Sequence, residues 1–597
     1  MSSLGLVFDI AKDALSAQRY GLDVTAHNIA NVNTPGYSRQ NPVYEAKIPA
    51  AYGELLLGRG VDTNTVMRTS DQFVENRLMQ QQSGLLYSKE MESYVKILEG
   101  IFNENTQTSI SDMMAGFWNL WQDISNNPSG SSERNALYEY SVQFSEQLNL
   151  LDTEMNQLDT DLTNSLNSGI SKINQITSEL SEINRQIPGM ETGSIANDLR
   201  DKRNDLLSEL SGYIDTKSFE QDNGSIAIVT AKGCVLVSGD SSYDLTLGGT
   251  NGNRVLWQGS DGNNTDITGY IGNGKLGGWL DMRDQILTKY TLDLDAFAKE
   301  FAWSVNLQHS QGIGLAGFSS VTGTYSATTP AAAITASGLS YQDKVDDSNK
   351  TFKIWLYDTN GNPYDSDTVT AGLQGNPITI TVTAGMTINE LVTAINSGTG
   401  VQASLDSQNR VTISINTGEI ATLGTLAFSD DTSNVLAALG INTFFSGSSA
   451  GNIAVNDRIG SDINAIAAAR INGDGTFAAG DNRNAMAVSG LQYASQSISR
   501  WTCDRINGNT EGTITTSLED YYHSLVGSIG ITSAGISRNK SFNEAMVSKL
   551  GAIRDGISAV SLDEEMTNLI KFQQAYAAAA KLIGTADEML KTLLSVK

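Results

Sequence analysis

The sequence of 597 residues is short of several residue types and patterns, and each shortage argues against a class of protein. Cysteine occurs only at Cys234 and Cys503, outside any C-x-x-C pair, so neither a disulfide framework nor a zinc cluster is indicated. Lys and Arg number 39 against 66 Asp and Glu, and the formal charge of −27 argues against nucleic acid or anionic lipid as the main partner. No apolar run is long enough to span a membrane. Asp9, Lys12 and Asp13 interrupt the apolar residues at the start, so a cleavable signal peptide is not predicted.

A heptad pattern at each end of the chain is the strongest positive signal. The N-terminal seam recurs at alternating spacings of four and three residues: Leu4, Phe8, Ala11, Leu15, Gln18, Leu22, Thr25 and Ile29. The C-terminal seam keeps the same rhythm: Leu562, Met566, Leu569, Gln573, Tyr576, Ala580, Ile583, Asp587, Leu590 and Leu594. Terminal segments usually fray, so two apolar seams there need a partner. We predict that the terminal helices pair with each other and with copies of the chain; the alternative is that both face the core of a globular domain.

The first third of the chain reads as mostly helical. The first helix should end at residues 30–37, where the Pro35-Gly36 pair fits the centre of a type II turn. Residues 40–70 read as extended or irregular, and helix returns from about Asp71. Apolar heptads over 137–187 predict a long helix that stops at Pro188-Gly189, followed by a short helix over 195–211.

The rest of the chain alternates between strands and helices. Two strands are predicted at 225–230 and 234–238, after a hairpin turn at Asp222-Asn223-Gly224. A helix over 279–308 follows, and then a Ser-, Thr- and Gly-rich region with strands at 352–357, 378–383 and 411–415. Thr387 and Glu390 form a capping box, which predicts a helix over 387–396. From about 515 the chain reads as helical to its end.

Several motifs of catalytic or ligand-binding type occur, but we interpret them as structural. G-x-G-x-x-G is found twice without the βαβ unit that dinucleotide binding requires: Gly272, Gly274, Gly277 and Gly312, Gly314, Gly317. The G-x-S-x-G of residues 447–451 lies in a loop, and none of the three histidines (His27, His309, His523) is placed for a catalytic triad. Asp358, Asn360 and Asn362 begin a calcium-loop pattern that Pro363 interrupts, so a β-turn is predicted.

An acidic cluster near the C-terminal seam has a catalytic and a structural interpretation. Asp563, Glu564 and Glu565 are paired carboxylates of the kind that acid–base chemistry uses. However, Ser561 and Glu564 have capping-box spacing, and negative charge is favourable at a helix N-terminus. We therefore predict a helix start here, and no catalytic, cofactor-binding or metal-binding residues in the chain.

Two stretches resemble the paired signatures of the flagellar rod, hook and hook-associated proteins. The first is ALSAQRYGLDVTAHNIANVNTPGYSR at residues 14–39, and the second is SLDEEMTNLIKFQQAYAAAAKLI at residues 561–583. The resemblance marks a family motif turn at the end of the first helix: Asn28, Asn31, Thr34, Pro35, Gly36 and Tyr37. NDLRDKRNDLLSELS at 197–211, ALGINTFFSG at 438–447 and GDNRNAMA at 480–487 resemble the hook-associated members, and residues 376–415 are similar to a small module of flagellin-related proteins.

The resemblance implies a structural protein at the hook–filament junction, exported without a cleaved signal peptide and located outside the cell. Its implied partners are a ring of its own copies, the hook protein on one side and a second hook-associated protein on the other. A dedicated chaperone at the C-terminal helix and the flagellar type III export apparatus are implied for export. Two other readings stay open: a hook or rod-type structural protein, and an enzyme carried on the surface.

Length and composition together predict an α+β chain of several domains. The predicted parts are a terminal helical assembly domain (1–40 with 556–597), a linker (41–70), a helical bundle (71–310 with 456–555, including a β region at about 213–275) and an inserted, mainly β outer domain (311–455, with the flagellin-type module near 376–415). The long helices expected over 71–211 argue against the hook or rod reading, because hook and rod proteins share the first signature but are mainly β between their ends.

Overall fold

The computed structural model describes residues 2–52, 55–103, 109–191, 195–249, 252–364 and 375–595. The chain forms two compact units, each built from segments that are distant in sequence. Unit 1 comprises Met1–Tyr94, Asp161–Met282 and Ala534–Lys597, and unit 2 comprises Val95–Thr160 and Arg283–Ser533. Both units contain helices and small antiparallel sheets, so the predicted α+β class is confirmed.

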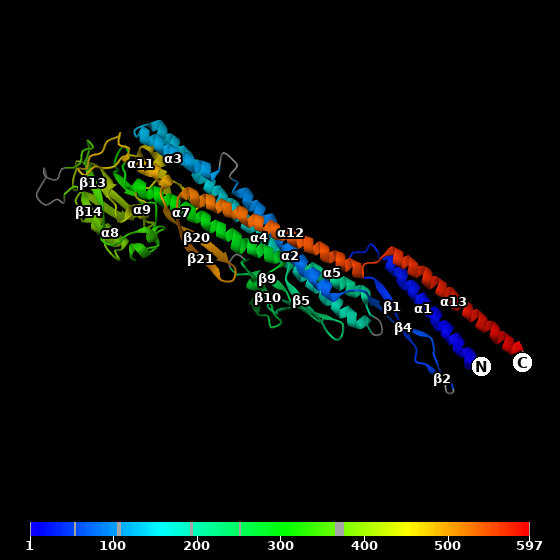
Figure 1. The fold of residues 1–597 in the computed structure, drawn as a ribbon. Helices are drawn as coiled ribbons and strands as arrows, with labels where there is room; N and C mark the ends of the chain where they lie inside the picture. The colour runs from blue at the N-terminus through cyan, green and yellow to red at the C-terminus, as the bar shows by residue number, and fades with distance from the viewer. Residues whose placement is uncertain are drawn as a thin grey trace. The chain divides into compact units, whose positions relative to one another are not determined.

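Long helices supply most of unit 1 (Figure 1). They are α1 (Ser2–Ala30), most of α2 (Gln72–Ile101), the second half of α4 (Ser131–Met190), α5 (Asn197–Tyr213), α6 (Gly274–Asp281), the second half of α12 (Leu518–Ser558) and α13 (Leu562–Ser595). The heptads of α4 are confirmed as core positions, because Ile173, Leu180 and Ile187 are almost fully buried. The helix ends at Met190, just after the predicted stop at Pro188.

The strands of unit 1 form several small sheets. β1 (Gln40–Ala46) and β4 (Val61–Arg68) form an antiparallel ladder, and β2 (Ala50–Tyr52) pairs with β3 (Leu55–Leu57). The segment 40–70, read as extended or irregular, is therefore largely a β-ladder. A four-stranded sheet consists of β5 (Thr216–Glu220), β6 (Ile226–Thr230), β7 (Val235–Ser238) and β8 (Ser241–Ser242). A three-stranded sheet consists of β9 (Leu245–Gly248), β10 (Arg254–Gln258) and β11 (Asn264–Asp266). The predicted hairpin turn at Asp222-Asn223-Gly224 joins β5 to β6, and Gly224 adopts a φ of 82°.

Unit 2 has a helical part with an aromatic core. Its helices include α3 (Ile110–Asn126), the first half of α4, the π-helical segment η3 (Met282–Leu287), α7 (Thr288–Ser310), α9 (Val435–Leu439), α10 (Asp457–Ser461) and α11 (Arg483–Ser489). Phe117, Phe144 and Phe301 stack against one another with ring centroids 4.8–6.3 Å apart, and all three are fully buried. The hairpin of β20 (Gln496–Asp504) and β21 (Gly508–Thr516) packs on α7.

Unit 2 also contains a β-rich segment, which lies within the residues 311–455 predicted as an insertion. Its two three-stranded sheets are formed by β14 (Ile378–Val382), β13 (Lys350–Asp358) and β17 (Leu423–Ser429), and by β12 (Ser320–Thr322), β16 (Val411–Ile415) and β15 (Val401–Leu405). A two-residue pair, β18 (Phe445–Ser446) and β19 (Ala454–Val455), follows. Helix α8 (Ile388–Asn396) begins at the predicted capping box, in which both the Thr387 and the Glu390 side chains bond to backbone N–H groups. The strands at 352–357, 378–383 and 411–415 are confirmed.

Candidate assembly site at the terminal helices

The two terminal helices, α1 and α13, lie side by side in unit 1 (Figure 1). Asn28 Nδ2 donates a hydrogen bond of 3.1 Å to Glu565 Oε2, and a Cβ atom added to Gly21 would lie 2.8 Å from Phe572 Cε1. The two contacts are seven residues apart on each helix and run in opposite directions, so the pair is antiparallel and in heptad register. The predicted pairing of the two chain ends is therefore present within one chain.

Both helices of this pair bury small side chains. On α1, Ala11 and Ala17 are almost fully buried, and Gly21 leaves no room for a side chain between Phe572 and Tyr44 of β1. On α13, Ala579 and Ala586 are buried in the same way. Small residues let two helices approach closely, so close packing of the two backbones contributes to this contact together with the burial of apolar side chains.

The structure distributes the predicted seam residues unequally. In the N-terminal seam Ala11 is buried, Phe8, Leu15, Leu22 and Ile29 are partly buried, and the side chain of Leu4 lies outside the described residues. In the C-terminal seam Leu569, Ile583 and Leu590 are partly buried, whereas Leu562, Met566, Tyr576, Ala580 and Leu594 are exposed. The face of α13 that contacts α1 passes through Glu565, Phe572, Ala579 and Ala586. It is offset by one residue, or about 100° around the helix, from the line through Met566 and Ala580.

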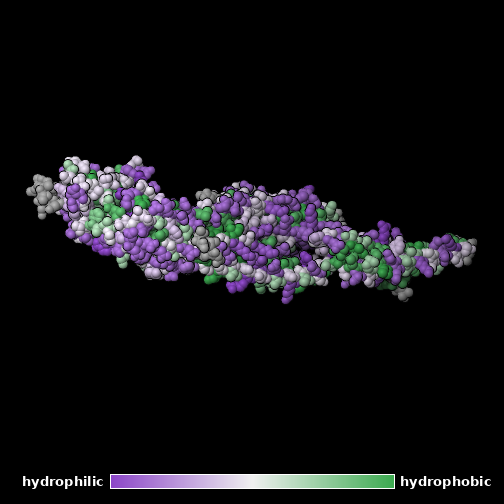
Figure 2. Space-filling model, turned by 90° about the horizontal axis from the view of Figure 1, so that it is seen from above, coloured by the Kyte–Doolittle hydropathy of each residue, from purple (hydrophilic) through white to green (hydrophobic). Residues whose placement is uncertain are grey.

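Large apolar side chains therefore remain uncovered on α13. Leu562, Met566 and Ile570 lie on successive turns of the helix and are 48%, 48% and 51% exposed. We call these three residues the outer apolar face of α13. Figure 2 shows hydrophobic residues gathered in the part of the surface where α13 begins and α1 ends. An apolar face on successive turns of a helix is typical of a surface that a partner covers.

A buried polar network, which we call the latch, lies at the base of the pair and consists of Asn28, Tyr37, Arg39 and Glu565. The Asn28 amide accepts hydrogen bonds from Tyr37 Oη at 2.7 Å and from the Gln40 N–H at 3.0 Å. It donates to the Gln40 carbonyl and to Glu565. Arg39 donates to Glu565 Oε1 at 2.8 Å and to Glu564 Oε2 at 2.7 Å. Asn28 and Glu565 are each only 1% exposed, so the network replaces water as their hydrogen-bonding partner.

The family motif turn places these groups. Tyr37 N–H donates to the Thr34 carbonyl, and Gly36 between them adopts a φ of 77°, so the predicted type II turn is confirmed. Helix α1 ends at Ala30 as predicted, and the Asn31 side chain bonds back to the His27 carbonyl. The turn brings the Tyr37 hydroxyl back to Asn28, nine residues earlier.

Helix α5 holds the other side of the turn. Asp201 accepts hydrogen bonds from the Ser38 N–H at 3.1 Å and from Arg68 Nη1 at 2.6 Å, and Asp198 accepts one from the Gln40 side chain. Burial, together with the carboxylates of Asp198, Asp201 and Glu565, raises the pKa of Tyr37, so its hydroxyl stays protonated as a donor. Asp198 and Asp201 belong to the stretch at 197–211 that resembles hook-associated proteins.

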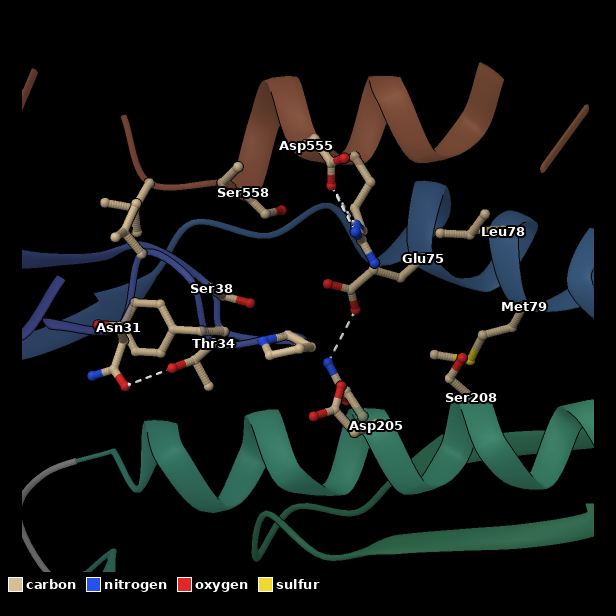
Figure 3. A pocket seen from close by; sticks show the side chains of 18 of the residues that line it. Asn31, Thr34, Ser38, Glu75, Leu78, Met79, Asp205, Ser208, Asp555 and Ser558 are labelled. Atoms are coloured by element: carbon tan, nitrogen blue, oxygen red, sulfur yellow. Dashed lines mark hydrogen bonds and ion pairs between the residues drawn. The ribbon is translucent and has the colours of Figure 1, made fainter. Parts of the chain in front are cut away.

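A cleft of about 240 Å³ opens beside the motif turn (Figure 3). Its walls are the turn itself, the start of α2, the middle of α5 and the end of α12. Glu75 accepts a hydrogen bond from Asn204 across it, and burial raises the pKa of the Glu75 carboxyl. The lining is mixed polar and apolar, and the described residues contain no group of His, Cys, Asp and Glu side chains that could hold a metal ion.

The acidic cluster lies at the start of α13, as predicted, and two of its side chains bind a residue that is distant in sequence. Glu564 and Glu565 both bind the guanidinium group of Arg39, 525 and 526 residues earlier in the chain. The predicted cap residue Ser561 contributes its carbonyl, which accepts the Glu565 N–H. Sequence reasoning identified the cluster but missed Arg39 as its partner, although Arg39 closes the first signature.

The remaining motifs are explained by packing. A Cβ atom on Gly274 would lie 2.5 Å from the Tyr213 backbone, and one on Gly314 would lie 2.2 Å from the Asn464 carbonyl, so both glycine patterns permit close backbone contacts. The G-x-S-x-G loop joins β18 to β19 as a hairpin. Asp358 Oδ1 accepts the N–H groups of Asn360 and Asn362, which confirms the predicted turn. Among the described helices, none combines the length and hydropathy needed to cross a membrane.

Four family models match separate parts of the chain. The flagellar hook-associated protein FlgK helical domain matches residues 95–323, and the flagellin hook IN motif matches residues 368–419. The flagella basal body rod protein family matches residues 8–37, and the flagellar basal body rod FlgEFG protein C-terminal family matches residues 556–596. The last two matches contain α1 with the motif turn, and α13.

Relatives with an assigned name match the chain over its full length. Flagellar hook-associated protein 1 of Bacillus subtilis is 27% identical over 604 residues, which cover 100% of this chain and 99% of the relative. The proteins of the same name from Escherichia coli and Salmonella typhimurium are 26% and 24% identical, with 100% of both chains covered in each comparison. A solved structure, the flagellar hook junction protein FlgK from Burkholderia pseudomallei, is 17% identical with a TM-score of 0.48 and covers 81% of this chain and 100% of its own.

The paired terminal helices and their two signatures define the class: this is a structural protein of the flagellar rod, hook and hook-associated group. The helical domain and the full-length relatives point to one member of this group. The chain is similar over its full length to flagellar hook-associated protein 1.

Proposed function

We propose that this chain is a structural component of the hook–filament junction and that the α1–α13 pair is the part that assembles. In this proposal one face of α13 packs on α1 within the chain, and the outer apolar face packs on a neighbouring subunit. The FlgK helical domain and the full-length relatives support the place in the flagellum. The exposure of Leu562, Met566 and Ile570 supports the role of the pair.

The outer apolar face is the observation that carries this proposal. Each of its three side chains leaves about half of its surface in water, although α13 is already paired. Complete burial of a large apolar side chain stabilises by about 1.5–3 kcal/mol relative to full exposure, so covering the remaining half of all three contributes roughly 2–5 kcal/mol per subunit. A contribution of that size, repeated around a ring of subunits, supports assembly without making the single chain insoluble.

The partners follow from the family. We propose a ring of copies of this chain, with the hook protein on one side and a second hook-associated protein on the other. Export through the flagellar type III apparatus, without a cleaved signal peptide, would place the ring outside the cell. The outer apolar face is also a suitable surface for an export chaperone on α13, because it must be covered before assembly.

The other parts of the chain are proposed to serve this assembly without catalysis. Residues 1–40 and 556–597 would form the assembly domain, and the bundle and the β-rich insertion at 311–455 would be domains separate from it. The β-rich insertion has a polar exterior, because none of its described large apolar side chains is exposed. The glycine motifs that could have indicated an enzyme serve backbone packing.

Complementation of a deletion strain tests the proposal. Loss of the gene should leave hooks without filaments in electron micrographs, whereas loss of a hook or rod-type protein would leave no complete hook. Met566→Asp should fail to restore filaments while the exported chain stays folded, because it puts a charge on the outer apolar face. Thr585→Asp, at an exposed polar position of the same helix, is the matched control and should restore them. Normal filaments with Met566→Asp would contradict the proposed role of this face.

A further inference from the structure

We propose that Glu565 is a positioning residue that fastens the whole of α13 to the rest of unit 1, so that the latch is a releasable hinge for the C-terminal helix. Its carboxylate uses both oxygens: Oε1 accepts from Nε and Nη2 of Arg39 at 2.8 Å, and Oε2 accepts from Asn28 at 3.1 Å. Only 1% of the residue is exposed. A buried charge with one missing partner is strongly unfavourable, so these contacts form or break together.

The position of the latch makes it a hinge. Only residues 559–561 separate α12 from α13, and the Arg39 N–H donates to the carbonyl of Ser558, the last residue of α12. Arg39 therefore contacts the end of α12 through its backbone and the start of α13 through its side chain. A single residue controls the angle at which the C-terminal helix leaves the body of unit 1.

Beyond the latch, α1 is the described element that α13 contacts extensively. Helix α1 is held independently, because Tyr44 of β1 donates to the Ala17 carbonyl and Lys47 forms an ion pair of 2.7 Å with Asp13. Two of the four residues named on the α13 contact face, Ala579 and Ala586, are alanines, so this face buries less apolar surface than large side chains would. Opening the latch should therefore loosen α13 and leave α1 docked on β1 and β4.

This inference rests on the proposed function and deepens it by naming what regulates the direction of α13 within the assembly pair. An adapter between two tubes of different mechanics needs subunits whose terminal helices take more than one direction. A polar latch suits this need, because its bonds can be exchanged for bonds to water when the helix swings. A hydrophobic anchor at the same place would resist that exchange.

The chain contains its own control for the test. Glu564 binds the same guanidinium as Glu565 and lies one residue away, but its side chain is 62% exposed against 2% for Glu565. Exposed ion pairs contribute little to stability, whereas buried ones are costly to break. Glu565→Gln and Glu564→Gln therefore remove the same charge from the same helix turn and differ in burial.

Hydrogen exchange of the purified, unassembled full chain, read by mass spectrometry, separates the outcomes. Glu565→Gln should speed exchange over 562–595 at least tenfold, while Glu564→Gln changes it less than twofold and the peptides of α5 keep their protection in both. Equal effects of the two variants would overturn the proposal. An effect of Glu565→Gln that spreads through α5 would overturn it as well, because Glu565 would then stabilise unit 1 generally.

A distance measurement provides the second readout. Spin labels at Ala580→Cys on α13 and Asn167→Cys on α4, both exposed positions, are introduced after Cys234 and Cys503 are replaced by serine. The distance distribution should be narrow in the parent chain and broad in Glu565→Gln. Unchanged narrow distributions would overturn the hinge. Both readouts use the unassembled chain, so their failure is separate from a failure of the assembly role, which filament attachment reports.

Discussion

Gly21 offers the sharpest test of the helix pair, because two glycines in the paired helices have opposite surroundings. A Cβ atom at Gly21 would lie 2.7 Å from Tyr44 Oη and 2.8–2.9 Å from the ring of Phe572, all inside normal contact distance. A Cβ atom at Gly584 of α13 would meet nothing within 4 Å. Replacing glycine by alanine within a helix stabilises it by about 1 kcal/mol through propensity, and overpacking costs about 1–3 kcal/mol.

The two effects therefore combine with opposite signs. Gly584→Ala only raises the helix propensity, without overpacking, and should stabilise α13 by about 1 kcal/mol. Gly21→Ala raises the helix propensity but also overpacks the contact, because the Phe572 ring must move away from α1. The two effects together should destabilise the pair by about 0–2 kcal/mol. The expected difference between the variants is about 2 kcal/mol, or roughly 30-fold in the equilibrium between docked and undocked helices.

Hydrogen exchange of the unassembled chain measures this difference directly. Peptides within 2–30 and 562–595 report the local opening of α1 and α13, so the result does not require two-state unfolding of the whole chain. Protection should rise with Gly584→Ala and stay level or fall with Gly21→Ala. Equal protection in both variants would refute the reasoning, since Gly21 would then not face Phe572 and the helices would not pair in this register.

Two further predictions concern single buried groups. Tyr37→Phe removes the hydroxyl that donates to buried Asn28 and should destabilise the latch by about 1 kcal/mol in exchange experiments, while Tyr493→Phe, at an 80% exposed tyrosine, should have no effect. His309 donates from Nδ1 to the Asn442 carbonyl and accepts the Ala467 N–H at Nε2, and burial lowers its pKa to about 4. His309 is therefore protonated near pH 6.5 in the unfolded chain but stays neutral in the folded chain down to about pH 4. The free energy of unfolding of unit 2 should therefore fall by about 2 kcal/mol between pH 7 and pH 5. Urea unfolding at the two pH values checks this: a drop of equal size in His309→Gln would contradict it.

Helix positions could be predicted from the sequence because they depend on local periodicity. The heptad spacing of Leu137, Phe144 and Leu151 predicts the buried positions of α4. The capping box of Thr387 and Glu390 predicts the start of α8. Periodicity also identified both terminal helices. It did not identify which face of α13 meets α1, because a seam is read from large apolar residues, while this contact face uses Ala579 and Ala586.

The β1–β4 ladder and the latch could not be predicted from the sequence, because each depends on residues that are distant along the chain. Pro42 lies within β1 opposite Val66, and a proline in a short segment reads as irregular unless the partner strand is known. Arg39 and Glu565 are 526 residues apart, so no local pattern connects them. The resemblance to flagellar proteins marked both stretches as important without saying that their side chains meet. Contacts of this kind are set by tertiary structure, which the two signatures encode only jointly.

The central claim is that a neighbouring subunit covers the outer apolar face of α13. Met566→Cys, in a chain whose Cys234 and Cys503 are replaced by serine, allows a maleimide label to measure it, with Gly473→Cys in an exposed loop of unit 2 as the control. Both cysteines should react in the purified chain. In intact flagella the cysteine at 473 should still react and the cysteine at 566 should be protected; equal labelling of the two in flagella would contradict the account.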